Sequence, residues 1–392
     1  MTAGAPLRAL VHDVIREKGS IPFDEFMDLC LYHPVHGYYC RPGMTTGPSG
    51  DFYTSPDLHP AFGLLVGRQI AEIEERTRTN EPVPFHIIEA GPGTGRLARD
   101  IIAGLAEEYP ALARRVIYTL VEISPSLKRL QAATIEAGGG QESVAGLRWL
   151  SWSEVLGDLR ATAFHGCVVA NEFLDALPVQ VVERREAELL ELHVASNGVR
   201  FAERLLPPRT PALAEHLWRL GVELEEGQRA EIGLNGLEWV GSLGRLFGEE
   251  GRGGAILIDY GHTSRDLYTP SRGRGTLLSY HRHQVVDDPY TRAGDQDMTA
   301  HVDFTAVSRR AREAGFDVAP LATQMRFLVS LGLAEILADL ASREDQGAGS
   351  IRQRMALHGL MAPGGMGEVF KVLLLSRETS AAGLTGAKDP FR

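Results

Sequence analysis

The stretch HIIEAGPGTGRLARDI, residues 86–101, decides the fold predicted for this chain. Its first residues form a short apolar run that predicts a buried strand, and its last residues have a spacing typical of a helix. Between them lie three alternate glycines, Gly91, Gly93 and Gly95. Glycine permits a tight turn and lets the backbone approach a ligand closely. The stretch therefore predicts a ligand site at the carboxyl end of a strand.

The glycine spacing discriminates between kinds of ligand. The dinucleotide fingerprint G-x-G-x-x-G needs glycine where this chain has Arg96, and the Lys-Ser/Thr pair of a Walker phosphate loop does not follow. Glu89, at the mouth of the strand, would repel a pyrophosphate and attract a cationic amine. Glu122, at the end of the next predicted strand, can accept hydrogen bonds from both hydroxyls of a ribose. These features favour S-adenosylmethionine, a nucleoside with a cationic tail that lacks phosphate.

Composition sets limits on the class of protein. The chain has 392 residues, of which 44% are hydrophobic, and a formal net charge of −11. An acidic chain is a poor candidate for binding nucleic acid, which requires clustered Lys and Arg. The three cysteines form no Cys-x-x-Cys pair, which indicates a reducing compartment. No signal peptide is evident, and no apolar run approaches the ~18–20 residues that span a bilayer. We therefore expect a cytoplasmic protein that does not bind a membrane.

Strand-like and helix-like segments alternate from residue 86 onward, and the last strand-like run is 367–377. This alternation predicts an α/β fold with a parallel sheet and helices on both faces. Asn197-Gly198 predicts a type I′ hairpin turn in an inserted region. The predicted parts are an N-terminal helical extension with a cofactor-lid loop (1–80), the first half of the core (81–180), an inserted β-rich lobe (181–250), the second half of the core (251–380) and a frayed tail (381–392).

A family resemblance makes the prediction more specific. The motifs that carry it are PFDEFMDLCLYHPVHGYY, GDFYTSPDLHPAFG, EAGPGTGRLARDI, ANEFLDALPV, LIDYG, GTLLSYHRHQVVDDPY and DMTAHVDFT, which together cover most of residues 20–330. In this order they resemble the MidA family of class I S-adenosylmethionine-dependent methyltransferases. The resemblance implies a seven-stranded methyltransferase sheet (Rossmann-like) with a variable insertion. A mitochondrial member of the family is associated with symmetric dimethylation of a protein arginine.

The motif NEFLD supplies the candidate catalytic residues. Asn171 and Glu172 end a buried strand, where polar side chains need partners or a ligand. Glu172 and Asp175 are close enough in sequence to face one pocket, and paired carboxylates would orient a guanidinium. Asp175 has an equal alternative role as the cap of the next helix. His301 is a candidate general base for a hydroxyl or carboxyl acceptor, although a structural role is favoured.

The remaining candidates concern the cofactor. Tyr53, Thr54 and Ser55 in GDFYTSP are expected to fold over it, because the resemblance implies that this segment lies nearby; loop structure alone is the alternative. Trp152 is expected either to pack on adenine or to be a core residue. The full set of expected cofactor contacts is Glu89, Gly91, Pro92, Gly93, Gly95, Glu122, Ile123, Trp152, Tyr53, Thr54, Ser55 and Asn171. The histidine spacing does not match a zinc site, so no metal is expected.

The methyl acceptor stays open between two classes. A protein arginine is the leading hypothesis, and a small biosynthetic intermediate, methylated on oxygen or nitrogen, is the second. A non-catalytic assembly protein with a retained cofactor site is a third hypothesis, which the intact glycines and acids disfavour. A nicotinamide dehydrogenase is disfavoured by Arg96. The sequence does not determine the oligomeric state, and a homodimer is one option.

Overall fold

The computed structural model describes residues 4–41, 53–80, 83–158, 163–342, 348–362 and 364–391. The chain divides into two compact units, each assembled from three stretches of sequence. The small unit contains Met1–Phe52, Leu174–Trp239 and Gly261–Val307, and the large unit contains Tyr53–Phe173, Val240–Tyr260 and Ser308–Arg392. The N-terminal extension and the inserted lobe, which the sequence analysis separated, therefore share one unit.

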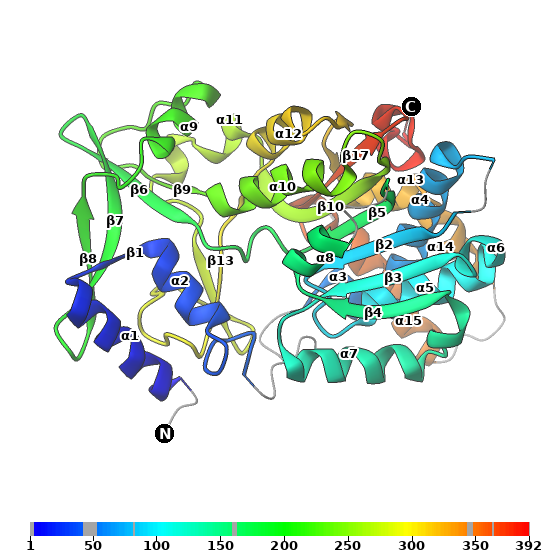
Figure 1. Cartoon of the computed structure of the whole chain (residues 1–392), viewed down its shortest axis with the longest axis horizontal. Coiled ribbons are helices and arrows are strands. Elements are labelled where there is room, and N and C mark those ends of the chain that lie inside the picture. Colours follow the sequence, from blue (N-terminus) through cyan, green and yellow to red (C-terminus); the bar gives the residue numbers. More distant parts are fainter. Residues whose placement is uncertain are drawn as a thin grey trace. The chain divides into compact units, whose positions relative to one another are not determined.

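A mainly parallel sheet forms the centre of the large unit (Figure 1). Its strands are β2 (Phe85–Ala90), β3 (Val116–Val121), β4 (Gly146–Leu150), β5 (His165–Asn171), β10 (Arg252–His262), β15 (Asp317–Val318) and β17 (Phe370–Arg377), with the short β14 (Val302–Asp303) beside β10 and β16 (Ala322–Thr323) beside β17. The order is β15-β17-β10-β5-β2-β3-β4, and β17 runs antiparallel to β10. The chain order reverses at β2, which lies between β3 and β5, and ligands of such sheets bind at that point.

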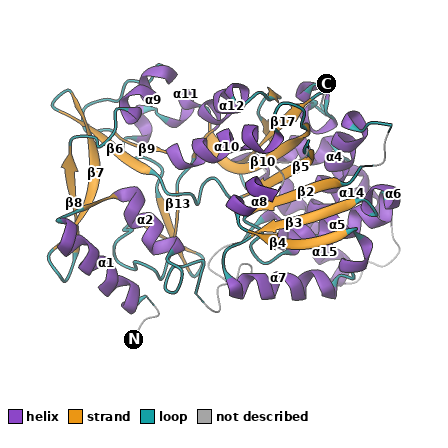
Figure 2. Ribbon diagram, in the orientation of Figure 1, coloured by secondary structure: helices purple, strands orange, loops and turns teal. Residues whose placement is uncertain are grey.

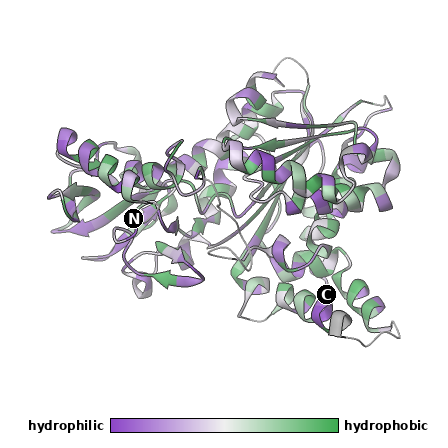
Figure 3. Cartoon of the chain, turned by 90° about the horizontal axis from the view of Figure 1, so that it is seen from below, coloured by the Kyte–Doolittle hydropathy of each residue, from purple (hydrophilic) through white to green (hydrophobic). Residues whose placement is uncertain are grey.

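Helices cover both faces of this sheet (Figure 2). The central strands are buried on both faces, as in Ile87 and Ile88 of β2, so each face needs a helical cover. The helices carry both hydrophobic and hydrophilic residues, as amphipathic packing requires (Figure 3). They are α3 (Ser55–Leu58), α4 (Ala61–Thr77), α5 (Arg96–Glu108), α6 (Pro110–Ala113), α7 (Pro125–Ala137), α8 (Trp152–Asp158), α10 (Leu234–Phe247), α12 (Phe304–Glu313), α13 (Gln324–Ser330), α14 (Leu333–Ser342), α15 (Ala348–Met361) and α16 (Met366–Val369).

The small unit contains two antiparallel sheets and its own core. In the first sheet the order is β1-β7-β6-β9 with β8 beside β7, and in the second it is β12-β11-β13. The strands are β1 (Ile21–Pro22), β6 (Gln180–Arg185), β7 (Glu188–Ser196), β8 (Phe201–Leu206), β9 (Arg229–Ile232), β11 (Leu278–His281), β12 (Gln284–Val286) and β13 (Asp297–Thr299); the helices are α1 (Ala5–Lys18), α2 (Phe23–Tyr32), α9 (Ala212–Leu220) and α11 (Ser264–Leu267). Apolar residues of α1 and α2 pack with residues of β6 and β7 in the core.

The predicted mixed α/β class is confirmed, with one local correction in the hairpin turn. Within the described residues the large sheet has nine strands, of which seven follow one order and two, β14 and β16, lie beside it. The turn after β7 is not type I′, because residues 197–200 separate paired Ser196 and Phe201, and Asn197 does not have positive φ. Instead the Asn197 side chain accepts hydrogen bonds from the N–H groups of Val199 and Arg200, at 3.0 and 2.8 Å.

The tail is not frayed, because its described residues pack on the large unit. Ala381 and Leu384 are fully buried, and the Thr385 N–H donates to Glu72 at 2.8 Å. Two short 3-10 helices, η4 (Ala381–Gly383) and η5 (Thr385–Ala387), form this region. In the described part of the chain, no helix is long and apolar enough to cross a bilayer.

Candidate active site

The glycine turn after β2 depends on left-handed backbone conformations. Gly91, Gly93 and Gly95 have φ values of 67°, 51° and 81°, which favour glycine. A Cβ atom on Gly91 would lie 2.9 Å from the Phe173 ring, and one on Gly95 would lie 2.9 Å from Gln131 Cα. A Cβ atom on Gly93 would meet nothing within 4 Å. Gly91 and Gly95 are therefore required for packing, whereas Gly93 leaves open space at the turn.

Gln131 connects this turn to the carboxylate at the end of β3. Its side-chain nitrogen donates to the Gly93 carbonyl and to Glu122 Oε2, both at 2.9 Å. The Glu122 Oε1 atom accepts the N–H groups of Ile123 and Ser124, both at 2.8 Å. Burial raises the pKa of Glu122, and these hydrogen bonds oppose that rise. The carboxylate is thereby held in one orientation beside the turn.

Glu89 lies deeper than the sequence argument assumed. Its side chain is 2% exposed and accepts a hydrogen bond from the Tyr118 hydroxyl at 2.7 Å. Burial raises the pKa of Glu89 to about 7, and the Tyr118 hydrogen bond opposes the rise. Glu89 is therefore a buried acidic group beneath the turn. Its attraction for a cation bound nearby would not require the side chain to be exposed.

Asn171 and Glu172 come together at the end of β5, as predicted. Asn171 Nδ2 donates to Glu172 Oε1 at 3.2 Å, and the Ser55 N–H donates to the same oxygen at 3.3 Å. Glu172 has a φ of 52°, a conformation that a non-glycine residue adopts at a cost. Asn171 is 9% exposed, and its Oδ1 atom is buried without a hydrogen-bond partner. A buried acceptor that lacks a donor fits a site that binds a ligand.

The segment 53–58 is attached to the glycine turn and to β5. Asp57 forms an ion pair with Arg96, the first residue of α5. Ser55 is fully buried, and its hydroxyl donates to Gln324 Oε1 at 2.9 Å. Thr54 and Asp57 form a reciprocal capping box at the start of α3. Tyr53 is 45% exposed. Residues 50–52 of the predicted lid, with Asp51, lie outside the described residues.

Ile123 and Trp152 are two further residues predicted to contact the cofactor, and their environments differ from each other. Ile123 is 56% exposed directly after β3, so its side chain is accessible to a ligand at the end of that strand. Trp152 begins α8, and its indole N–H donates to Ser242 Oγ at 2.8 Å. The hydrogen bond fixes the indole ring, which is consistent with both roles considered for Trp152.

Asp175 and His301 belong to the small unit. Asp175 is 4% exposed, and its carbonyl accepts a hydrogen bond from the Ala300 N–H at 3.0 Å. The rings of His301 and His262 are tilted by 37° relative to each other, with 5.3 Å between the ring centroids. The backbone N–H of His301 donates to Thr276 Oγ1 at 3.1 Å. Both residues therefore occupy ordered positions in the small unit.

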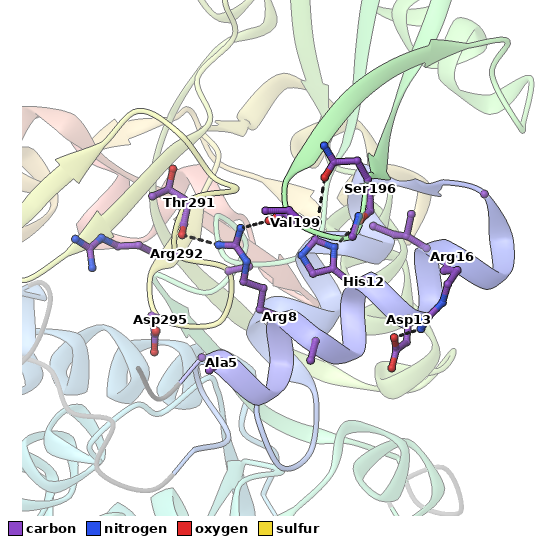
Figure 4. Close-up of a pocket in the computed structure, with 17 residues that line it drawn as sticks. Ala5, Arg8, His12, Asp13, Arg16, Ser196, Val199, Thr291, Arg292 and Asp295 are labelled. Carbon is purple, nitrogen blue, oxygen red and sulfur yellow. Dashed lines mark hydrogen bonds and ion pairs between the residues drawn. The ribbon is translucent and has the colours of Figure 1, made fainter. Parts of the chain in front are cut away.

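A groove of about 840 Å³ also lies in the small unit, lined by α1, the turn after β7 and residues 291–295 (Figure 4). Arg8 crosses it and donates to the carbonyls of Val199 and Thr291, at 2.9 and 3.2 Å. His12 Nδ1 lies 2.5 Å from Ser196 Oγ. These contacts connect three segments of the small unit, and no residue predicted for the cofactor lines the groove.

The sequence analysis missed Gln131 and the Asp57–Arg96 pair, although both left a signal. Gln131 lies between Leu127 and Ile135 at the helical spacing of the buried face of α7, where a polar residue must find partners. Asp57 follows Thr54 by three positions, which is the spacing of a capping box.

The sheet order, the glycine turn and the carboxylate after β3 define a methyltransferase that depends on S-adenosylmethionine. A family model described as "Putative S-adenosyl-L-methionine-dependent methyltransferase" matches residues 65–321. The chain belongs to this family, the MidA family of S-adenosylmethionine-dependent methyltransferases. The cofactor expected from the sequence, S-adenosylmethionine, is thereby confirmed.

Two kinds of relative support this membership. The human protein arginine methyltransferase NDUFAF7 is 31% identical, with 94% of this chain and 82% of that protein covered. Its zebrafish counterpart is 29% identical, with 90% and 82% covered. A crystal structure from Burkholderia thailandensis that contains S-adenosyl-homocysteine is 30% identical with a TM-score of 0.86, and the match covers 99% of this chain and 96% of that one.

These comparisons correct the location expected from the sequence. The vertebrate relatives are named as mitochondrial proteins, which contradicts the expected cytoplasmic location. Cysteine usage distinguishes reducing from oxidising compartments, and it does not separate one reducing compartment from another.

Proposed function

We propose that this enzyme methylates an arginine side chain of a protein. The NDUFAF7 relatives bear the name protein arginine methyltransferase, and they match more than four fifths of this chain. The observation that carries the proposal is the carboxylate of Glu172, which lies at the carboxyl end of β5 beside the buried Asn171. A carboxylate there suits the forked donors of a guanidinium.

The cofactor roles follow from the same geometry. We assign Glu122 to the ribose hydroxyls, Gly93 and its neighbours to close approach of the backbone, and Ile123 to the adenine face. The unpartnered Asn171 Oδ1 is a suitable acceptor for a donor of the cofactor. Pro92 shapes the turn, since its carbonyl accepts the Gly95 N–H at 2.8 Å. Tyr53, Thr54 and Ser55 border the same region through Glu172.

The chain's residues must align the acceptor and remove one proton. When bound, the cofactor supplies a methyl group activated on a sulfonium. Glu172 would bind and orient the guanidinium so that one nitrogen can accept the methyl group. Arginine stays protonated at neutral pH, so the nitrogen releases its proton as the new N–C bond forms, and Glu172 receives it.

The finer organisation is also a proposal. The large unit corresponds to the methyltransferase core, in which seven strands follow one order and β16 is an addition. The short β14 lies in residues of the small unit. The small unit, which includes the inserted residues 181–239, selects the acceptor. The five-part division expected from the sequence stays a prediction, and so does a homodimer.

The test is methyl transfer from labelled S-adenosylmethionine into a protein mixture, followed by acid hydrolysis and separation of the amino acids. Label in methylated arginine supports the proposal. Label confined to small molecules favours the alternative acceptor class, and label in other amino acids contradicts an arginine acceptor.

A further inference from the structure

The small unit contains a group of acidic and aromatic side chains on one face of its β11–β13 ladder. Tyr280 of β11 pairs directly with Asp297 of β13, and Leu278 pairs with Thr299. Residues that pair across a ladder, or that lie two apart on one strand, share a face. Tyr280, Asp297 and Thr299 therefore point to the same side. Met298 points to the opposite side, into the core.

Neighbouring elements add to this face. β13 lies beside α2, whose last residue is Tyr32 (Figure 1). The Tyr39 hydroxyl donates to Asp297 Oδ1 at 2.6 Å, and the rings of Tyr32 and Tyr39 are 5.5 Å apart. The Ala300 N–H, directly after β13, donates to the Asp175 carbonyl. Two carboxylates and three tyrosines from four segments thus meet in the small unit.

The two carboxylates act on the same tyrosines. Burial raises the pKa of Tyr32, of Tyr39 and of Tyr280, and the charges of Asp297 and Asp175 raise each of these pKa values further. Asp297 is 2% exposed and Asp175 is 4% exposed. Two buried carboxylates in one cluster offer several acceptor oxygens to a planar cation that has several donors. Tyrosine rings also attract a cation through their faces.

Thr299 provides the independent observation. It is 3% exposed, and its hydroxyl has no hydrogen-bond partner. A buried hydroxyl that lacks a partner destabilises the folded protein relative to valine, so a structural role does not explain it. Thr299 lies on the same face as Asp297 and Tyr280. Its hydroxyl oxygen can therefore accept a hydrogen bond from a cation bound at this face.

We propose that Asp297, Asp175, Thr299 and the surrounding tyrosines form a binding site for the guanidinium of an arginine side chain in the acceptor. This inference rests on the proposed function, because the arginine that binds here belongs to the acceptor protein. Asp297 and Asp175 supply the charge, Tyr39 fixes Asp297, and Tyr280 and Tyr32 supply aromatic surface. Free guanidinium compounds and arginine peptides share this chemistry, whereas a metal ion is a separate outcome of the test.

The test uses the full chain saturated with S-adenosylhomocysteine and three peptides, Gly-Gly-Xaa-Gly-Gly with Xaa as arginine, lysine or citrulline, titrated calorimetrically. We expect the arginine peptide to bind, and the neutral citrulline peptide to bind at least about tenfold more weakly. Asp297→Asn should weaken arginine binding by about tenfold or more and leave the Kd of S-adenosylhomocysteine unchanged. Asp295→Asn, which removes a nearby carboxylate paired with Arg41, should leave both affinities unchanged.

Thr299→Val separates binding from structure. Because it removes an unpartnered hydroxyl, we expect a higher melting temperature together with several-fold weaker binding of the arginine peptide. The proposal would be overturned if the wild-type protein did not bind the arginine peptide or bound the citrulline peptide equally well. Unchanged arginine binding in both Asp297→Asn and Thr299→Val would also overturn it. So would binding of Mg²⁺ or Ca²⁺ that is lost in Asp297→Asn while binding of the peptide is unaffected. Arginine binding without methyl transfer to protein would contradict the proposed function alone, and methyl transfer with an unchanged KM in both variants would contradict this site alone.

Discussion

At the scale of single residues, the cofactor site depends on a side chain that contacts three parts of the large unit. Gln131 donates to Gly93 and Glu122, and its oxygen accepts the Trp149 indole N–H at 2.9 Å. All three contacts come from one fully buried amide. Gln131 therefore positions Glu122 and the turn, and we expect it to affect the cofactor only through them.

We expect Gln131→Ala to weaken binding of S-adenosylhomocysteine by about tenfold or more, because Glu122 loses a donor that fixes its orientation. Isothermal titration calorimetry measures the effect. Gln180→Ala is the control, since Gln180 is also a buried glutamine that donates to a carboxylate, Asp24, but lies in the small unit. If both variants bound equally well, the positioning role of Gln131 would be excluded.

Glu89 gives a prediction about pH. Its pKa in the folded protein is about 7, against an ordinary value of 4.5. Between these pH values the folded state holds a proton that the unfolded state has released, so stability falls as pH rises. Below pH 4.5 both states are protonated, and above about pH 7 both are ionised, so the contribution changes only within this window.

The comparison of wild type with Glu89→Gln isolates this group from the other acids. We expect the stability of the variant relative to wild type to rise by up to ~3 kcal/mol between pH 4.5 and pH 8. Chemical denaturation at a series of pH values measures the difference. A difference that stayed constant over this range would show that Glu89 ionises with an ordinary pKa.

At the scale of elements, the glycines of the turn after β2 have different roles. Gly95 is required for packing, whereas Gly93 is expected to allow contact with the ligand. Gly95→Ala places a Cβ 2.9 Å from Gln131 Cα, whereas Gly93→Ala meets nothing within 4 Å. Both positions have positive φ, which costs alanine roughly 1–2 kcal/mol.

We therefore expect Gly93→Ala to lower the melting temperature less than Gly95→Ala, while it still weakens binding of S-adenosylhomocysteine at least about tenfold because its methyl group fills open space at the turn. Thermal melting and calorimetry test the pair together. Cofactor affinity at the wild-type level in Gly93→Ala would mean that the ligand does not approach this part of the turn.

The elements of the sheet could be predicted because their signals are local. The apolar run before Gly91 and the helical spacing after it identify β2 and α5 from a few adjacent residues. The contacts of Gln131, Asp57 and Arg96 join residues far apart in sequence, so the local signals around Gln131 and Asp57 do not identify their partners. The hairpin turn failed as a type I′ prediction because Asn197 used its side chain to organise a longer loop.

At the scale of the whole molecule, the chain order hides the two units. Each unit consists of three separate stretches of the chain. The strand β10 begins in residues of the large unit and ends in residues of the small unit. Sequence patterns predicted an insertion but not that the first 52 residues and residues 261–307 pack in the same unit, because that grouping depends on tertiary contacts. The large unit contains the residues that we propose for the cofactor, and the small unit contains the acidic and aromatic face of β11 and β13.

The central claim is that Glu172 acts on the acceptor and not on the cofactor. The most direct measurement compares wild type with Glu172→Gln for the Kd of S-adenosylhomocysteine and for single-turnover methyl transfer to protein arginine, with the exposed Glu154→Gln as the control. We predict an unchanged Kd and a rate lower by about 100-fold or more in Glu172→Gln, with both quantities unchanged in Glu154→Gln. Methyl transfer by Glu172→Gln at the wild-type rate would contradict it.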